Sequence, residues 1–304
     1  MTSDPQGKFL FVVNGDGLAN VPNTVTAYTI ASSTGILTKV GTYPTGTNPW
    51  ASAVAPSGNY LYVRCDGTLS VYAIDATTGA LTAGTPVTTA GGTGDVLVHP
   101  SGRQLYSLGR TTDQLQVFDI DASTGVPTLH SSLGLPFGAG ALSLALSNTG
   151  EVLFTKSEGA ASGAAQECIV YAYQVEIEAG GLTALAPMDT GLTQADSYHG
   201  VSANPTQSVI YLTLSTTHDD YAAYAYNLLT GELTALTDSP YELFGGTGSD
   251  SLVVSRNGKW GLLTNYNGNE VAIGAINSGT GVLATPTHLS TGSFPVCVTV
   301  VGTF

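Results

Sequence analysis

A degenerate repeat of about 44 to 57 residues runs along the whole chain and constrains its fold more than any other feature. Each copy opens with a short turn, and then come an alternating apolar run such as NYLYV, a second such as LSVYAID, a Thr-Gly turn and two further short runs. The six opening turns are Pro5-Gln6-Gly7, Pro56-Ser57-Gly58, Pro100-Ser101-Gly102, Asn148-Thr149-Gly150, Pro205-Thr206-Gln207 and Arg256-Asn257-Gly258.

Four short strands in about 40 to 50 residues make one propeller blade, a small sheet with two apolar faces that is stable only against neighbouring blades. We therefore expect an all-β, six-bladed β-propeller with four-stranded blades, as a single domain over residues 1–304. The chain begins with a run typical of the second strand of a blade (residues 8–13). It ends with FPVCVTVV (294–301), a run typical of a first strand. The sequence thus predicts a ring closed by pairing this C-terminal strand with the three N-terminal strands.

Charge and hydropathy exclude two classes of partner. The net charge of −14 repels nucleic acid phosphates and anionic membrane surfaces. No apolar stretch approaches the roughly 20 residues that span a bilayer, so we expect no membrane insertion. The expected partner is therefore a small molecule, a glycan or a protein.

The compartment is less constrained. The opening MTSDPQGKFL has neither the basic nor the apolar region of a signal peptide. Few lysines and much Ser, Thr and Gly favour a secreted or periplasmic protein whose signal has been removed, with a cytoplasmic protein as the alternative. Cys65, Cys168 and Cys297 are an odd number, so at least one thiol is free, and their disulfide status is open.

Three of the eight basic residues follow the second strands of consecutive blades and are expected on one face of the propeller. Arg64 and Lys156 each lie six residues after the turn glycine, and Arg110 lies two positions further along its own repeat. Together they could bind an anionic ligand. Alternatively, they form surface ion pairs of little energetic value with neighbouring carboxylates. Those carboxylates are Asp66, Asp113 and Glu158.

The loops that lead into the innermost strands hold the other candidates. GTGD and GTGSD place Asp95 and Asp250 before blades three and six, which lie opposite each other in a six-membered ring. His199, in DSYHG, is a candidate general base that the Asp250 carboxylate would orient, or else a hydrogen-bonded structural residue. Trp50 either stacks on a ligand such as a sugar or plugs the channel.

No cofactor is expected. Several aspartates could supply oxygen ligands for a calcium ion in the channel, but the D-x-D-x-D-G spacing is absent.

The unit P-S-G-x-x-L-Y-V followed by V-x-x-Y-x-I-D-x-x-T-G-x-L-T resembles the lactonase-like, YVTN-repeat propellers. That family includes 6-phosphogluconolactonase and the carboxy-muconate cyclases, and its clearest copies here are Tyr60-Leu61-Tyr62-Val63 and Val71-Tyr72-Ala73-Ile74-Asp75. The resemblance implies a seven-bladed fold and a catalytic Arg-His pair that precedes an innermost strand. Neither matches, because six repeats are counted and His199 lies one place before the position of the family's histidine. The residues at that position are Ala51, Asp95, Ser143, Gly200, Ser251 and Cys297.

Two function classes follow. The main expectation is an exported, non-catalytic propeller that binds a glycan, small ligand or protein. The alternative is a lactone hydrolase or cyclase acting on a small carboxylated or sugar lactone, with His199 as base, Asp250 orienting it, and Arg64, Arg110 and Lys156 holding a carboxylate. Whether the protein is an enzyme is left open by the sequence.

Overall fold

The computed structural model is built from β-strands. It describes residues 1–15, 22–92, 94–136, 143–156, 167–193, 200–214, 220–244, 249–293, 295 and 297–301. Its strands form six antiparallel sheets of four main strands each, and no helix occurs in these ranges. No helix in the described part of the chain could therefore span a membrane.

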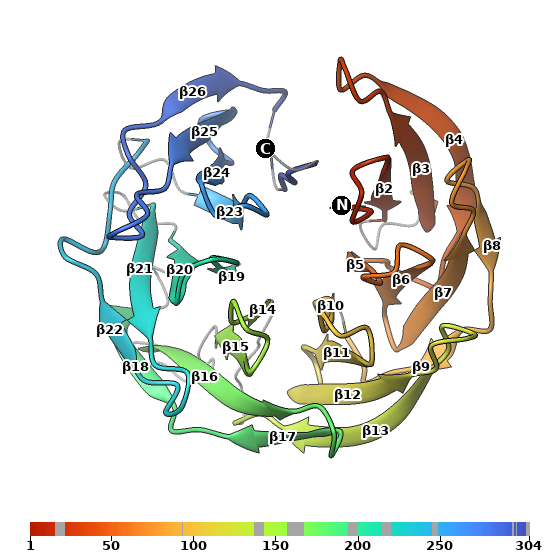
Figure 1. Cartoon of the computed structure of the whole chain (residues 1–304), viewed down its shortest axis with the longest axis horizontal. Helices are drawn as coiled ribbons and strands as arrows, with labels where there is room; N and C mark the ends of the chain where they lie inside the picture. Colours follow the sequence, from red (N-terminus) through yellow and green to blue (C-terminus); the bar gives the residue numbers. More distant parts are fainter. Residues whose placement is uncertain are drawn as a thin grey trace. The chain divides into compact units, whose positions relative to one another are not determined.

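The chain divides into two compact units, and the first contains Met1–Pro136 with Glu176–Gly181. Its three blades are coloured red to yellow in Figure 1. Blade 1 contains β1 (Thr2–Ser3), β2 (Phe9–Asn14), β3 (Thr24–Ile30) and β4 (Leu37–Pro44). Blade 2 contains β5 (Ala51–Val54), β6 (Tyr60–Cys65), β7 (Thr68–Ile74) and β8 (Leu81–Ala83), with β9 (Val87–Thr88) also on β7. Blade 3 contains β10 (Val96–Val98), β11 (Gln104–Gly109), β12 (Gln114–Ile120) and β13 (Pro127–Gly134).

The second unit contains most of the remaining chain and three further blades, green to blue in Figure 1. Blade 4 contains β14 (Leu144–Leu146), β15 (Val152–Lys156), β16 (Glu167–Glu176) and β17 (Gly181–Ala184), with β18 (Met188–Thr193) also on β16. Blade 5 contains β19 (Val201–Ala203), β20 (Val209–Thr213), β21 (Tyr221–Tyr226) and β22 (Leu233–Ala235). Blade 6 contains β23 (Ser249–Val254), β24 (Trp260–Asn265), β25 (Glu270–Ala275) and β26 (Thr287–Ser290).

The prediction of an all-β fold with six four-stranded propeller blades is confirmed. That residues 1–304 form a single domain stays a prediction.

The prediction that the C-terminal strand completes the first blade is wrong. The innermost strand of blade 1 is β1, which pairs Thr2 with Phe11 and Ser3 with Leu10. The described residues near the C-terminus, 295 and 297–301, contain no strand. Asp4 explains why β1 pairs with β2. Its carboxylate accepts hydrogen bonds from the backbone N–H groups of Gln6, Lys8 and Phe9 at 2.6–3.0 Å and so holds the turn between the two strands. A turn this short brings two strands together at far smaller entropic cost than closure of a loop of several hundred residues.

Four of the five Thr-Gly turns of the repeat share one structural cause, an Asp or Asn cap. In blade 2, the Asp75 carboxylate accepts hydrogen bonds from the N–H groups of Thr77 and Thr78 at 2.9 and 2.8 Å. Gly79 then takes a φ of +73°, a conformation that favours glycine. Asn227 and Asn277 accept the same hydrogen bonds in blades 5 and 6, which explains why either Asp or Asn occurs at this position.

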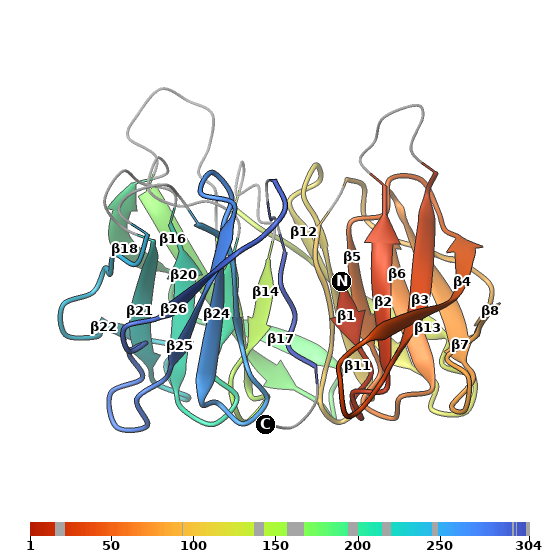
Figure 2. The ribbon, with the colours of Figure 1, turned by 90° about the horizontal axis from the view of Figure 1, so that it is seen from above.

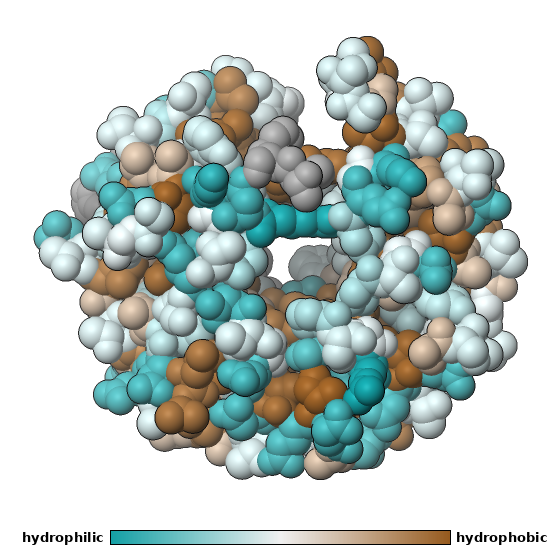
Figure 3. Space-filling model, viewed as in Figure 1, coloured by the Kyte–Doolittle hydropathy of each residue, from teal (hydrophilic) through white to brown (hydrophobic). Residues whose placement is uncertain are grey.

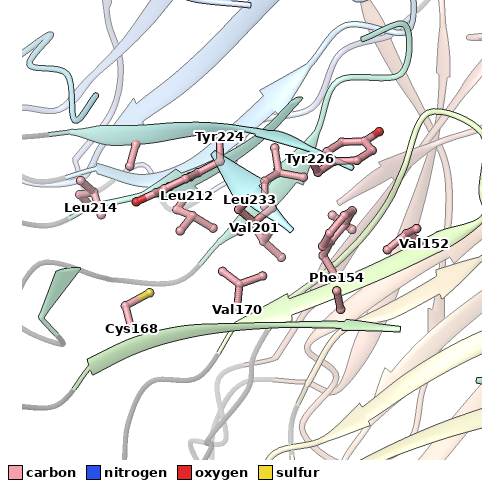
Figure 4. Close-up of a cluster of buried hydrophobic side chains, with 14 residues drawn as sticks. Val152, Phe154, Cys168, Val170, Val201, Leu212, Leu214, Tyr224, Tyr226 and Leu233 are labelled. Atoms are coloured by element: carbon pink, nitrogen blue, oxygen red, sulfur yellow. The ribbon is translucent and has the colours of Figure 1, made fainter. Parts of the chain in front are cut away.

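Buried apolar clusters lie between consecutive blades within each unit. Figure 4 shows one in the second unit, where Phe154 and Val170 of blade 4 meet Leu212 and Tyr224 of blade 5. The tyrosine of the L-Y-V repeat adds a polar contact, because Tyr62 Oη donates to the Gly125 carbonyl at 2.8 Å and so joins blade 2 to blade 3. Tyr211 joins blade 5 to Gly281 of blade 6 in the same way, at 2.7 Å.

Candidate functional site

The residues predicted to bind a ligand in the first unit lie at one end of blades 2 and 3. This end holds the β6–β7 and β11–β12 hairpins and is opposite the Pro-Ser-Gly turns, as the side view in Figure 2 shows for each sheet. Arg64 is near the end of β6, Trp50 directly precedes β5, and Asp95 directly precedes β10. Arg110 directly follows β11.

Arg64 is the largest fully buried side chain of the described residues. Its guanidinium donates only to backbone carbonyls in the hydrogen bonds found. Nη2 reaches the Ala90 and Gly92 oxygens at 2.6 and 2.8 Å, and Nε reaches the Leu108 oxygen at 3.2 Å. Nη1 donates to the carbonyl of the adjacent Cys65. Arg64 therefore ties β6 of blade 2 to β11 of blade 3 and to the loop that precedes β10.

Two more side chains bind the loop that precedes β10, which contains Ala90 and Gly92. The Asp66 carboxylate accepts the Gly92 N–H at 2.8 Å, and the Gln116 side-chain oxygen accepts the Ala90 N–H at 2.6 Å. Both N–H and C=O groups of Ala90 and Gly92 are thus bonded to side chains from blades 2 and 3. Gly92 has a φ of +85°, and a Cβ there would lie 2.7 Å from the Thr111 nitrogen, so the close approach requires glycine.

Backbone contacts bring the other three candidates close to Arg64. Trp50 N–H donates to the Arg64 carbonyl at 2.8 Å, and Leu108 N–H donates to the Asp95 carbonyl at 3.0 Å. Leu108 is the residue whose carbonyl accepts the Arg64 guanidinium, and Arg110 is two residues further along the chain. The structure therefore brings Arg64, Arg110, Asp95 and Trp50 close together, and their role in binding a ligand stays a prediction.

These four side chains differ in access to solvent. Trp50 is 49% exposed and Arg110 is exposed, whereas Asp95 is half-buried and its Oδ1 accepts its own neighbour's N–H, that of Val96, at 2.9 Å. Arg64 is fully buried. Arg110 and Trp50 are thus the members that solvent reaches, while direct contact of a ligand with Arg64 would require its hydrogen bonds to carbonyl groups to exchange.

Arg64 remains charged at neutral pH. Burial lowers the pKa of its guanidinium from 12.5 to about 10, against smaller opposing effects of Cys65 and Asp66. Burial also raises the pKa of the Cys65 thiol. The end of blades 2 and 3 therefore holds a fixed buried cation beside a neutral thiol.

The structure describes only part of the three candidate residues in the second unit. Lys156 is the last residue of β15 and is buried. Asp250 lies in β23, but its side chain is outside the described residues, as is all of His199. The roles predicted for these three residues stay predictions.

No group of three or more His, Cys, Asp or Glu side chains is placed to hold a metal ion in the described part of the chain. Its three cysteines are free thiols, with Cys65 and Cys168 buried and Cys297 exposed. On the face drawn in Figure 3, small apolar areas alternate with polar ones.

Sequence reasoning missed the two loop anchors, Asp66 and Gln116. The sequence offered Asp66 as an ion-pair partner of a nearby cation or as one of several possible calcium ligands, whereas its carboxylate accepts a hydrogen bond from a backbone N–H. Gln116 had a detectable signal, because it occupies an inward position of the alternating run LQVFDI where its neighbours Leu115 and Val117 are also buried. A polar residue at such a position needs a hydrogen-bond partner.

Comparisons with known proteins point to one family. Residues 2–85 match the family model described as "Lactonase, 7-bladed beta-propeller". The resemblance to the lactonase-like propellers is confirmed. The matched part contains the two runs that carry the resemblance, and no curated protein sequence matches this chain.

Three solved structures share the fold over nearly the whole of this chain. A putative 6-phosphogluconolactonase from Bacteroides fragilis has 20% identity and a TM-score of 0.78, with 97% of this chain and 85% of that one covered. The periplasmic gluconolactonase of Pseudomonas aeruginosa has 18% identity and a TM-score of 0.78, covering 97% and 87%. A protein from Lactobacillus plantarum has 18% identity and a TM-score of 0.79, covering 97% and 85%. At these identities the likeness is one of fold.

Proposed function

We propose that this protein hydrolyses a small lactone, as the alternative interpretation of the sequence has it. The observation that carries the proposal is the match of residues 2–85 to the lactonase family model, together with structural neighbours that are described as lactonases. These comparisons favour a lactone hydrolase over a binding module. Location outside the cytoplasm belongs to the same proposal, since one neighbour is described as periplasmic.

The reaction needs few protein groups. Water adds to the lactone carbonyl carbon, the ring C–O bond breaks, and the proton lost by water ends on the released alkoxide oxygen. Negative charge develops on the carbonyl oxygen, so a positive field in the site accelerates the step. Arg110 is the exposed cation of the first-unit group and would bind a carboxylate or other anionic substituent, while buried Arg64 supplies fixed charge nearby.

The proton transfer is assigned to His199, oriented by Asp250, and Lys156 is proposed as a further cation for the substrate. A histidine suits this task because its pKa lies near neutral pH. These assignments rest on the sequence, and the role of His199 is tested by substitution.

The experiment is a hydrolysis assay on paired lactones, each pair consisting of a carboxylated lactone and its uncharged analogue. We expect turnover by the wild type, loss of turnover in His199→Ala, and a tenfold or greater rise in KM for the carboxylated member alone in Arg110→Ala. Arg256→Ala is the matched control, because this exposed arginine lies in the opening turn of blade 6 and should leave both parameters unchanged. Absence of turnover on every lactone would contradict the proposal.

The binding module keeps one observation in its favour. Trp50 is 49% exposed and the Arg64 donors are already bonded within the protein, an arrangement suited to stacking an uncharged sugar. If no lactone is hydrolysed, a glycan-binding screen with Trp50→Ala as control tests this second candidate.

A further inference from the structure

Asp66 lies at the tip of the β6–β7 hairpin and holds two loops at once. Its backbone N–H donates to the Thr47 carbonyl at 2.8 Å, in the loop that ends at Trp50 and leads into β5. Its carboxylate accepts the Gly92 N–H at 2.8 Å, in the loop that leads into β10. A hairpin turn of only two residues, Asp66 and Gly67, therefore connects the loop of blade 2 to the loop of blade 3, and Figure 1 shows these two blades side by side in the first unit.

The loop that ends at Trp50 has further contacts that fix its backbone. Asn48 N–H donates to the side-chain oxygen of Asn23, the residue before β3, at 3.0 Å. Gly46 N–H donates to the Ser70 hydroxyl oxygen of β7, also at 3.0 Å. The exposed Trp50 indole is therefore carried by a loop that blades 1 and 2 both hold in place.

The loop before β10 packs against the turn that carries Arg110. Gly92 is buried, and a Cβ at its position would lie 2.7 Å from the Thr111 nitrogen. A Cβ on Gly109 would lie 2.6 Å from the Ala90 Cβ. The two backbones approach this closely because both glycines lack a side chain. The loop thus lies directly against both residues that flank Arg110.

The hydrogen bonds within that turn are long. The Thr112 N–H and hydroxyl both donate to the Gly109 carbonyl, at 3.3 and 3.2 Å, beyond the usual range for such bonds. The position of Arg110 therefore depends on the loop packed against its turn, and Asp66 holds that loop.

We propose that Asp66 is a positioning residue for the lactone hydrolysis: it fixes the turn of Arg110 relative to the loop of Trp50, so that one substrate contacts both side chains. This inference rests on the proposed function. Trp50 offers the flat face of its indole to a ring, and Arg110 binds an anionic substituent on that ring. The substrate class that suits this pair is a sugar-like lactone with a carboxylate.

The charge of Asp66 separates this role from a purely electrostatic one. A carboxylate at the same end of blades 2 and 3 repels an anionic substrate, so removal of the charge alone should lower KM. Loss of the contact with Gly92 should raise KM, because Arg110 is then no longer held in position. Asp66→Asn keeps a side-chain oxygen that accepts the Gly92 N–H, whereas Asp66→Ala does not.

The test is steady-state hydrolysis of a carboxylated lactone and its uncharged analogue, beginning with saccharolactone and γ-gluconolactone. In Asp66→Ala we expect KM for the carboxylated lactone to rise about three- to tenfold, with kcat and the KM for the uncharged lactone unchanged. Asp66→Asn should restore the KM of the wild type. In the Arg110→Ala background, Asp66→Ala should have no further effect on KM, because it acts through Arg110.

Asp121→Ala is the matched control. The Asp121 carboxylate also accepts backbone N–H groups in a turn, those of Ser123 and Thr124 at 2.9 Å, but this turn lies at the opposite end of blade 3. Asp121→Ala should therefore leave every KM unchanged.

Hydrogen exchange of the protein without ligand gives a second readout that needs no turnover. In Asp66→Ala, exchange should accelerate in peptides that cover residues 89–92 and 109–113, and in Asp66→Asn it should not. Unchanged exchange at 109–113 overturns the inference. So does a KM for the carboxylated lactone that stays the same or falls in Asp66→Ala, or that rises further when Asp66→Ala is added to Arg110→Ala, while the proposed function stands on the turnover of the wild type. Absence of turnover on every lactone contradicts the proposed function, and the exchange result then decides whether Asp66 holds the turn of Arg110.

Discussion

Replacing Arg64 with methionine should destabilise the protein substantially. Methionine retains an unbranched chain of similar length but removes all of the hydrogen bonds to the carbonyls of Cys65, Ala90, Gly92 and Leu108. A buried acceptor that loses its donor costs about 1–3 kcal/mol. The Ala90 and Gly92 carbonyls alone therefore amount to roughly 2–6 kcal/mol. Part of this is offset because the guanidinium no longer has to be removed from water, which leaves about 2–4 kcal/mol.

The assay is thermal unfolding followed by circular dichroism. At about 2–4 °C per kcal/mol for a chain of this size, Tm should fall by roughly 4–16 °C. Hydrogen exchange should also accelerate in peptides that cover residues 89–92, because the loop loses its main tether. Arg64→Lys should give an intermediate result, since an ammonium keeps the charge but cannot bridge as many carbonyls.

Arg103→Met is the control. Arg103 forms an exposed ion pair with Glu178 at 2.8 Å, an interaction that contributes under about 1 kcal/mol. If Arg64→Met is no less stable than Arg103→Met, or if exchange of the 89–92 loop is unchanged, the structural role derived for Arg64 is refuted.

Two further predictions concern glycine and tyrosine. Gly125→Ala should lose about 1–3 kcal/mol more stability than Gly35→Ala in denaturant unfolding, because both glycines have a φ of +69° but only Gly125 has an aromatic ring, that of Tyr60, at its Cβ position. Equal losses would contradict this account of the blade contact. Burial raises the pKa of Tyr211 and Tyr224 from 10 to about 12, so the unfolded chain loses these protons first and stability is full below pH 10 and falls from pH 10 to 12. Phenolate absorbance should show these tyrosines ionising together with the loss of circular dichroism, and ionisation of all 15 tyrosines near pH 10 with the fold retained would disprove it.

The repeat made the blades predictable because its residues act locally. The alternating runs, the glycines with positive φ and the Asp or Asn that caps four of the five Thr-Gly turns are all satisfied within one blade. The innermost strand of blade 1 escaped prediction because Thr2 and Ser3 are too few to show an alternating pattern, and their pairing depends on the Asp4 turn.

The candidate site was predictable only in part. Repeat position placed Arg64, Asp95, Arg110 and Trp50 at one end of blades 2 and 3, since equivalent positions in equivalent strands end at the same place. The position of Arg64 in the repeat does not predict whether its guanidinium is buried or exposed.

That difference has a physical reason. The sequence by itself determined the strands, the turns and the blade count, because hydrophobic alternation and turn chemistry are properties of neighbouring residues. Only the tertiary structure decided that Arg64 donates to Ala90, Gly92 and Leu108 and that Tyr62 reaches Gly125. Each of these facts depends on which blade lies beside which, and the sequence of a single blade does not contain its neighbour.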